Sequence, residues 1–246
     1  MFNLNDWLYV YKKAGKLFLE RGKNLGMGIA LSWGILLAYV LITPLLFAGG
    51  SMFSGLLFSL WQAVLLSVLY YLVLSVIRNH RVGFHTFKDG MMAFFYKVLG
   101  VRFLLWILYA FAGNAFLYRF SFAGVAVIPF LLYMALSPLP ETIYLRNESF
   151  TGVFERIFHF QKENIVIWTA MMAVWQVVFY GISGTLDLDL LTIAPFASTV
   201  RGLSNILILG LGQALFFLWM VYRGLVYQIL DKSSRRKREF ERRMIV

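Results

Sequence analysis

The side chains with the most versatile chemistry in this chain are three histidines, His80, His85 and His159. Imidazole binds metals and exchanges protons near neutral pH. With Glu155 or Glu163 these histidines could form a metal site, but their spacing matches no known ligand pattern. An intramembrane enzyme acting on lipid would have to use them. We therefore expect no metal, no cofactor and no enzymatic activity.

Motifs for other kinds of catalysis do not occur in the sequence. The absence of cysteine excludes disulfides, thiolate metal sites and a cysteine nucleophile. No G-x-S-x-G elbow, phosphate-binding loop or zinc-protease motif is found. Any energy for transport would have to come from another chain.

Two further sets of polar side chains could bind a ligand. Asp187 and Asp189 could bind a cation, or they could cap a short helix or pair with Arg201. The expected membrane spans carry almost no ionisable residue, which argues against an ion-coupled mechanism. They do carry five amides, which serve either as hydrogen bonds between helices or as substrate ligands: Gln62, Asn114, Gln176, Asn205 and Gln213.

The composition sets the class of protein that must position these residues. Of 246 residues, 60% are hydrophobic and only 14% are charged, too few to cover a soluble domain of this length. We expect an all-α polytopic membrane protein with a single membrane domain, residues 1–246. The net charge of +11 is explained by basic cytoplasmic loops rather than by nucleic-acid binding.

Apolar runs predict six transmembrane helices arranged as three hairpins, each long enough to cross about 30 Å of hydrocarbon. Their expected ranges are 25–47, 53–77, 99–117, 121–145, 165–183 and 203–230. Pro138 and Pro140 lie within the fourth range. They either end that helix at the membrane surface or kink a helix that continues to Leu145 and could act as a hinge.

Each hairpin is preceded by a predicted amphipathic surface helix, at 4–20, 83–97 and 149–162. In the first, Lys12, Lys13 and Lys16 form a basic face, either toward lipid headgroups or on a helix packed against the protein. The apolar sides of the second and third carry aromatic residues that we interpret as partner-binding, with Lys88 beside them: Phe84, Phe87, Phe94, Phe150 and Phe154.

The distribution of basic residues predicts the orientation. Lys and Arg concentrate in the N-terminal segment, in the two inner loops (Arg102 included) and from Arg223 through the tail 231–246, whereas the opposite side has only Arg119 and Arg201. This asymmetry places both termini in the cytoplasm, in a membrane that we expect to be the bacterial cytoplasmic membrane. The tail is also expected to contact anionic headgroups through Arg235, Arg236, Lys237 and Arg238.

Two stretches resemble known families. The runs YYLVLSVIRNHRVGFHTFKDGMMAFFYKVLGVRFLLWIL and IYLRNESFTGVFERIFHFQKENIVIW look like YesL-like bacterial membrane proteins and the membrane half of membrane-anchored glycerophosphodiester phosphodiesterases. The layout is also similar to six-span permease subunits of ABC-type exporters. The latter resemblance implies that residues 83–97 form a coupling helix that contacts an ATPase.

Two functions follow from these observations. The first is a transport-type subunit that handles hydrophobic or amphipathic cargo with a partner chain, which would be an ATPase. The second is a scaffold or assembly factor of a larger membrane complex, without transport. Both predict contacts with other subunits or with further copies of this chain in an anionic bilayer, and the sequence does not separate them.

Overall fold

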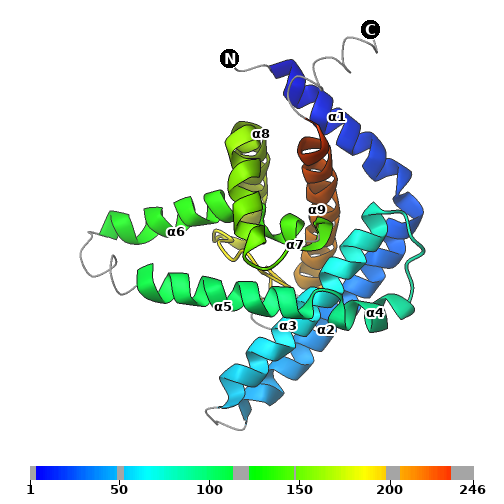
Figure 1. Cartoon of the computed structure of the whole chain (residues 1–246). Coiled ribbons are helices and arrows are strands. Elements are labelled where there is room, and N and C mark those ends of the chain that lie inside the picture. The colour runs from blue at the N-terminus through cyan, green and yellow to red at the C-terminus, as the bar shows by residue number, and fades with distance from the viewer. Residues whose placement is uncertain (1–3, 49–52, 113–121, 147, 198–205, 234–246) are drawn as a thin grey trace.

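The computed structural model describes residues 4–48, 53–112, 122–146, 148–197 and 206–233, and the regular structure within these ranges is α-helical. This confirms the all-α class (Figure 1). In chain order the helices are α1 (Leu4–Glu20), α2 (Gly22–Ala48), α3 (Phe53–Ile77), α4 (His85–Ala93), α5 (Phe95–Ala112), α6 (Phe122–Leu136), α7 (Leu139–Leu145), α8 (Gly152–Ser183) and α9 (Ile206–Lys232).

Four of the described helices are long and apolar enough to cross a membrane: α2, α3, α8 and α9. A fifth crossing is possible if α4 and α5, which meet at a bend of 47°, count as one broken span. These helices fit an integral membrane protein. The six predicted spans are not confirmed. The end of the predicted third span and its connection to the fourth fall within residues 113–121, which lie outside the described residues.

The outer faces of these helices are apolar. Leu37, Leu41 and Leu45 on α2 are 59%, 65% and 71% exposed, and Leu207 and Leu211 on α9 are 76% and 70% exposed. Contiguous apolar surface of this kind is unfavourable in water and is stable against lipid chains. Exposure of leucine along two long helices is therefore the structural evidence for a membrane location.

The C-terminal half of α3 forms the centre of the core. Every residue of the range 72–77 is buried, because α2, α7 and α9 surround this part of the helix. Gly224 of α9 allows this helix to approach α3 and α7 closely. A Cβ atom added there would lie 2.4 Å from Cδ1 of Ile77 and 2.6 Å from the hydroxyl of Tyr144, so a larger residue would push α9 away from α3 and α7.

Helix α4 lies beside the middle of α3, not beyond its end (Figure 1). The Ser67 hydroxyl donates to the Gly90 carbonyl at 2.6 Å and accepts from the Phe94 amide at 2.9 Å. Ser67 lies about 15 Å from the C-terminal end of α3 at 1.5 Å per residue. The helix predicted on the membrane surface over 83–97 is thus a short helix folded back along α3. Gly90 permits this, because its backbone approaches the α carbon of Val68.

The predicted surface helix 149–162 and the predicted span 165–183 are one continuous helix, α8. No glycine or proline separates the two ranges, and the buried side chain of Asn164 donates to the Phe160 carbonyl at 3.2 Å instead of interrupting the helix. The helix ends at Gly184, which has a positive φ of 71°.

The proline segment directs the chain into the core. Helix α6 ends at Leu136, and α7 starts at Leu139 with Pro140 in its first turn, where a missing amide donor costs nothing. Residues 139–144 are all buried. The predicted fourth span 121–145 is therefore two helices, and its second part is surrounded by protein rather than ending at a membrane surface.

Helix α1 packs across the C-terminal half of α9 (Figure 1). Val10 and Ala14 are fully buried, and the Tyr11 hydroxyl donates to the Ile167 carbonyl of α8 at 2.7 Å. Lys12, Lys13 and Lys16 face outward. Of the two interpretations of this helix, packing against the protein is the one that these contacts describe. Headgroup binding by the lysines stays a prediction.

Candidate functional site

A bidentate ion pair between Glu141 and Arg223 occupies the core. Arg223 of α9 donates from Nε to Oε1 of Glu141 at 2.6 Å and from Nη2 to Oε2 at 2.8 Å. Glu141 is 0% exposed and Arg223 is 6% exposed. The guanidinium also lies 5.9 Å from the centre of the Trp168 ring and reaches the Ser137 carbonyl at 3.3 Å. Both charges are thus paired and supplied with further polar contacts.

This ion pair corrects the expectation that the helical interior carries almost no ionisable residue. Glu141 lies in the proline-containing segment, and Arg223 lies near the end of an apolar run, where we counted it as part of the basic tail. The two positions are 82 residues apart in the sequence. No local spacing reveals such a pair, and only the fold brings it together.

The segment after α8, residues 184–197, folds back between the helices. Leu190, Leu191, Ile193 and Phe196 are each at most 6% exposed. Two of the membrane amides hold this segment. Gln176 accepts from the Asp187 amide at 3.1 Å and donates to the Asp187 carbonyl, and Gln213 donates to the Ile193 carbonyl at 3.2 Å. These amides therefore bind an inserted loop rather than a facing helix. Asn114 and Asn205 lie outside the described residues.

The two loop aspartates each stabilise a turn. Asp187 Oδ1 accepts from the Asp189 amide at 3.3 Å, and Asp189 Oδ1 accepts from the Leu191 amide at 3.0 Å. The predicted role of capping a short helix is not what these contacts show, because the described residues 184–197 form turns and no helix. Arg201, the predicted ion-pair partner, lies outside the described residues. Burial, followed by the nearby charge of Asp189, raises the pKa of Asp187 to about 7.

Asp187 borders a cavity in the core beside the ion pair. Tyr70, Tyr133, Ser137 and Arg223 also line this cavity, whose volume is about 10 Å³. That volume accommodates about one water molecule. This cavity is too small for a substrate, so among the described residues the surroundings of the ion pair form a packed polar core.

A much larger groove lies between the N-terminal half of α3 and α5, with a volume of about 1090 Å³. This is slightly larger than ordinary small-molecule sites, which measure roughly 300–1,000 Å³. Its walls are mainly apolar and include the exposed rings of Phe103 and Trp106, which stack with centroids 6.2 Å apart. The lining residues are Gly55, Leu56, Ser59, Leu60, Tyr96, Leu99, Gly100, Arg102, Phe103, Leu105, Trp106, Tyr109, Phe150, Asp189 and Leu191.

Arg102 is the cation of this α3–α5 groove. Its Nη2 atom donates to Oε1 of Gln62 on α3, and its Nη1 atom is buried without a hydrogen-bond partner among the described residues. Gln62 lies about 14 Å from the start of α3 and about 22 Å from its end. We counted Arg102 with the cytoplasmic loop. The structure instead places it beside the middle of an apolar helix, where an ionisable residue marks a candidate functional site.

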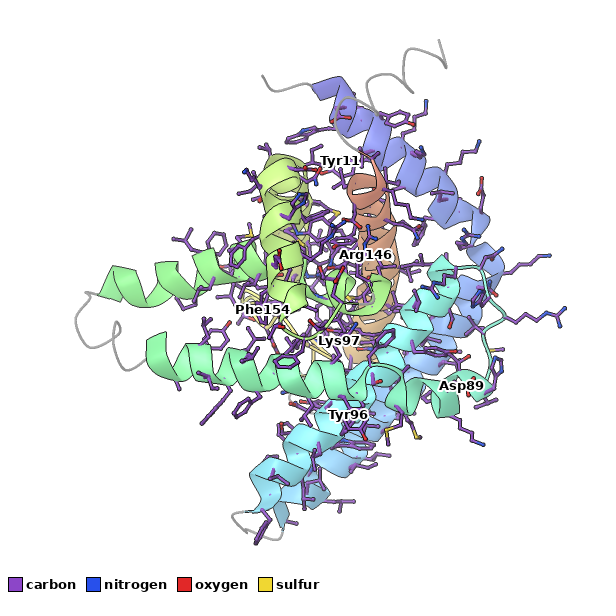
Figure 2. The ribbon with its side chains drawn as sticks, in the orientation of Figure 1. Tyr11, Asp89, Tyr96, Lys97, Arg146 and Phe154 are labelled. Carbon is purple, nitrogen blue, oxygen red and sulfur yellow. The ribbon has the colours of Figure 1, made fainter. Side chains whose placement is uncertain are left out.

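A lysine in the first turn of α5 joins this helix to the end of α7. Lys97 points toward the end of α7, where its Nζ donates to the Arg146 carbonyl at 3.0 Å and to the Ile143 carbonyl at 3.4 Å (Figure 2). The Arg146 side chain binds Asp231 of α9, which also accepts from Arg156 of α8. This network joins the ends of α7 and α9 to α8. It fixes the groove wall relative to the core.

The predicted partner-binding residues separate into exposed and packed groups. Phe84, 84% exposed, and Phe150, 47% exposed and part of the groove, are available for contact. Lys88 is exposed on α4, while the other predicted aromatic residues pack against the core: Phe87, Phe94 and Phe154.

The two remaining groups of predicted ligands are the histidines with their neighbouring acidic residues, and the basic tail. Within the described ranges, no three His, Asp or Glu side chains form a group that could hold a metal ion. The basic tail residues Arg235, Arg236, Lys237 and Arg238 lie outside the described residues. The α3–α5 groove is therefore the candidate site. The sequence signal that could have revealed it is Arg102, an isolated cation inside an otherwise apolar run.

Comparisons with family models, with curated proteins and with solved structures find no match for this chain. The resemblances to YesL-like proteins, to the membrane half of glycerophosphodiester phosphodiesterases and to exporter permeases thus stay predictions. The functional interpretation rests on the geometry of the α3–α5 groove.

Proposed function

We propose that this chain is the permease-like subunit of a transport-type membrane complex, and that it holds hydrophobic or amphipathic cargo in the α3–α5 groove. One observation carries the proposal: an apolar groove of about 1090 Å³ with an incompletely hydrogen-bonded arginine beside the middle of α3. Apolar walls favour the hydrocarbon part of a cargo molecule, and the arginine favours a polar or anionic part.

The energy source in this proposal is a partner chain, because the sequence contains no phosphate-binding loop of its own. Helix α4 offers a contact point through the exposed side chains of Phe84 and Lys88. The proposed membrane is the bacterial cytoplasmic membrane, with both termini on the cytoplasmic side. This orientation requires an even number of crossings. The number is four if only α2, α3, α8 and α9 cross, and six if α4 with α5 forms a fifth crossing and α6 a sixth.

The competing function is a scaffold or assembly factor. The packed core around Glu141 and Arg223 favours it, because a core without a chamber has no internal space for cargo. Under this interpretation the groove would hold annular lipid without selectivity. The two functions differ in whether the groove retains specific molecules, and this difference can be measured.

The test is purification from native membranes in mild detergent, followed by mass spectrometry of bound amphiphiles and co-purifying chains. Gly100→Trp is the test variant, because Gly100 lines the groove and its missing Cβ points to the Phe150 ring, 3.5 Å away. Gly181→Trp is the matched control, because it makes the same change on an exposed part of α8 where nothing lies within 4 Å.

We expect the wild type and Gly181→Trp to retain about one cargo molecule per chain together with a nucleotide-binding partner, and Gly100→Trp to lose the cargo. Equal amphiphile content in all three proteins, with only other membrane proteins recovered, would contradict the transport proposal and support the scaffold.

A further inference from the structure

The α3–α5 groove carries two opposite charges that do not pair with each other. Arg102 and Asp189 both line it, and Asp189 is exposed. Among the described residues, no Lys or Arg nitrogen lies within 4.0 Å of the Asp189 carboxylate, although the two groups are near enough to interact electrostatically. A separated cation and anion in one apolar groove form a template for a ligand with the complementary pair of charges.

We propose that the cargo of this groove is a zwitterionic phospholipid with a primary amine, whose phosphate binds Arg102 and whose ammonium group binds Asp189. This inference rests on the proposed function and names the class of its cargo. A glycerophosphoethanolamine headgroup has the required charges, a phosphate and an ammonium group a few bonds apart.

Arg102 has the chemistry to bind the phosphate. A guanidinium group carries five N–H donors in a planar fork that matches phosphate oxygens. Gln62 accepts one of these hydrogen bonds and fixes the side chain, and Nη1 has no partner among the described residues. Within apolar surroundings, an incompletely bonded guanidinium is stabilised strongly by an anionic oxygen.

Asp189 has the chemistry to bind the amine. Its Oδ1 atom accepts from the Leu191 amide at 3.0 Å, which holds the carboxylate in place and leaves Oδ2 for the ligand. The buried side chains of Leu190 and Leu191 anchor this part of the loop. A lipid with only negative charge would bring its headgroup near Asp189 without a compensating ammonium group. The pair of charges therefore selects a zwitterionic headgroup over an anionic one.

The position of Arg102 along α3 connects lipid binding in the groove with transport. The Arg102–Gln62 contact lies beside the middle of α3, whereas a phospholipid at rest keeps its headgroup at the membrane surface. A headgroup bound at that depth, with its chains along Phe103 and Trp106, is partway between the two leaflets. The groove would thus hold a phospholipid during its movement across the bilayer.

The experiment uses the full chain, delipidated in a non-lipid detergent and titrated with two dioctanoyl lipids in native mass spectrometry. The probes are dioctanoyl phosphatidylethanolamine and dioctanoyl phosphatidylglycerol, and free glycerophosphoethanolamine serves as a competitor without chains. The proteins are the wild type, Arg102→Gln, Asp189→Asn and the groove-filling Gly100→Trp. Asparagine at 189 keeps the oxygen that accepts from Leu191, so the loop retains that contact.

We expect the wild type to bind the ethanolamine lipid about tenfold more tightly than the glycerol lipid, a difference of about 1.4 kcal/mol. Asp189→Asn should abolish this preference, Arg102→Gln should weaken both lipids, and Gly100→Trp should prevent binding. Free glycerophosphoethanolamine should not compete.

Two other results would overturn the inference, and they differ in scope. Equal wild-type affinities for both lipids, both lost in Gly100→Trp, would refute the headgroup assignment while leaving cargo binding in the groove intact. Binding that Gly100→Trp does not change would refute the groove itself, and with it the proposed function.

Discussion

Arg223 and Arg102 are both arginines inside apolar helices, and their surroundings differ in every respect. Arg223 is 6% exposed, makes a bidentate ion pair and faces a tryptophan ring. Arg102 borders an open groove and has an amide, not a carboxylate, as its hydrogen-bond partner. A buried arginine whose charge is fully matched by the protein holds a fold together. One whose charge is left unmatched is available to a ligand.

The largest effect should come from separating the central ion pair. Arg223→Met leaves Glu141 buried without its counter-charge, which we expect to cost about 3–5 kcal/mol of stability. Arg102→Met should cost about 1 kcal/mol or less, because only an amide loses its partner. Urea unfolding in mixed micelles measures both.

The double variant Arg223→Met with Glu141→Leu controls for the lost side-chain volume. It should recover much of the stability, since no charge stays buried alone. Equal destabilisation by Arg223→Met and Arg102→Met would remove the distinction between the packed core and the groove.

The second effect concerns Asp187, which lies between the two regions. Its pKa of about 7 in the fold exceeds the ordinary value of 3.8, so the folded chain binds a proton that the unfolded chain has released. Stability should therefore fall as pH rises from about 4 to 7, and by about 1 kcal/mol between pH 6 and pH 8. Asp187→Asn should remove this part of the pH dependence, as measured by thermal unfolding at both pH values.

Asp189→Asn is the matched control for this pH dependence. It keeps the half-buried Asp187 carboxyl and removes only the neighbouring charge, so the midpoint should move down without disappearing. An unchanged pH profile in Asp187→Asn would show that this carboxyl is not buried in the working protein.

The smallest effect on stability is expected at Phe84, the residue that directly precedes α4. Phe84→Ala should change stability by less than about 0.5 kcal/mol, because this ring is 84% exposed. It should nonetheless reduce recovery of the partner chain in a native-membrane pull-down. Phe87→Ala should cost about 1 kcal/mol, because Phe87 packs against the core. Full partner recovery with Phe84→Ala would exclude α4 as the contact point.

Local sequence patterns predicted the parts of the fold that local physics determines. The ranges 25–47 and 53–77 correspond closely to α2 and α3, because an apolar run of this length has few alternatives to a helix. The predicted helix over 4–20 corresponds to α1. The exposed leucines on α2 show why composition alone indicated a membrane protein.

Features that depend on distant contacts were not predictable in this way. Positive-inside counting treats an arginine near the start of an apolar run as a surface residue, yet α5 begins at Phe95 and places Arg102 two turns inside. The return of α4 along α3 depends on Gly90, and the insertion of residues 184–197 depends on Gln176 and Gln213. In the sequence alone, each of these residues is equally consistent with a more common role, and only its contact partner in the fold identifies the role that it has.

The length of α8 has a mechanical consequence. As one unbroken helix of 32 residues it is about 48 Å long, well beyond the roughly 30 Å of hydrocarbon that it would cross. Near one end Arg156 binds Asp231, and near the other end Gln176 is hydrogen-bonded to the loop that carries Asp189. Arg156 and Gln176 lie 20 residues apart on this one helix, which is about 30 Å, so α8 holds the ion-pair network and the loop with the groove's acidic residue at a set separation.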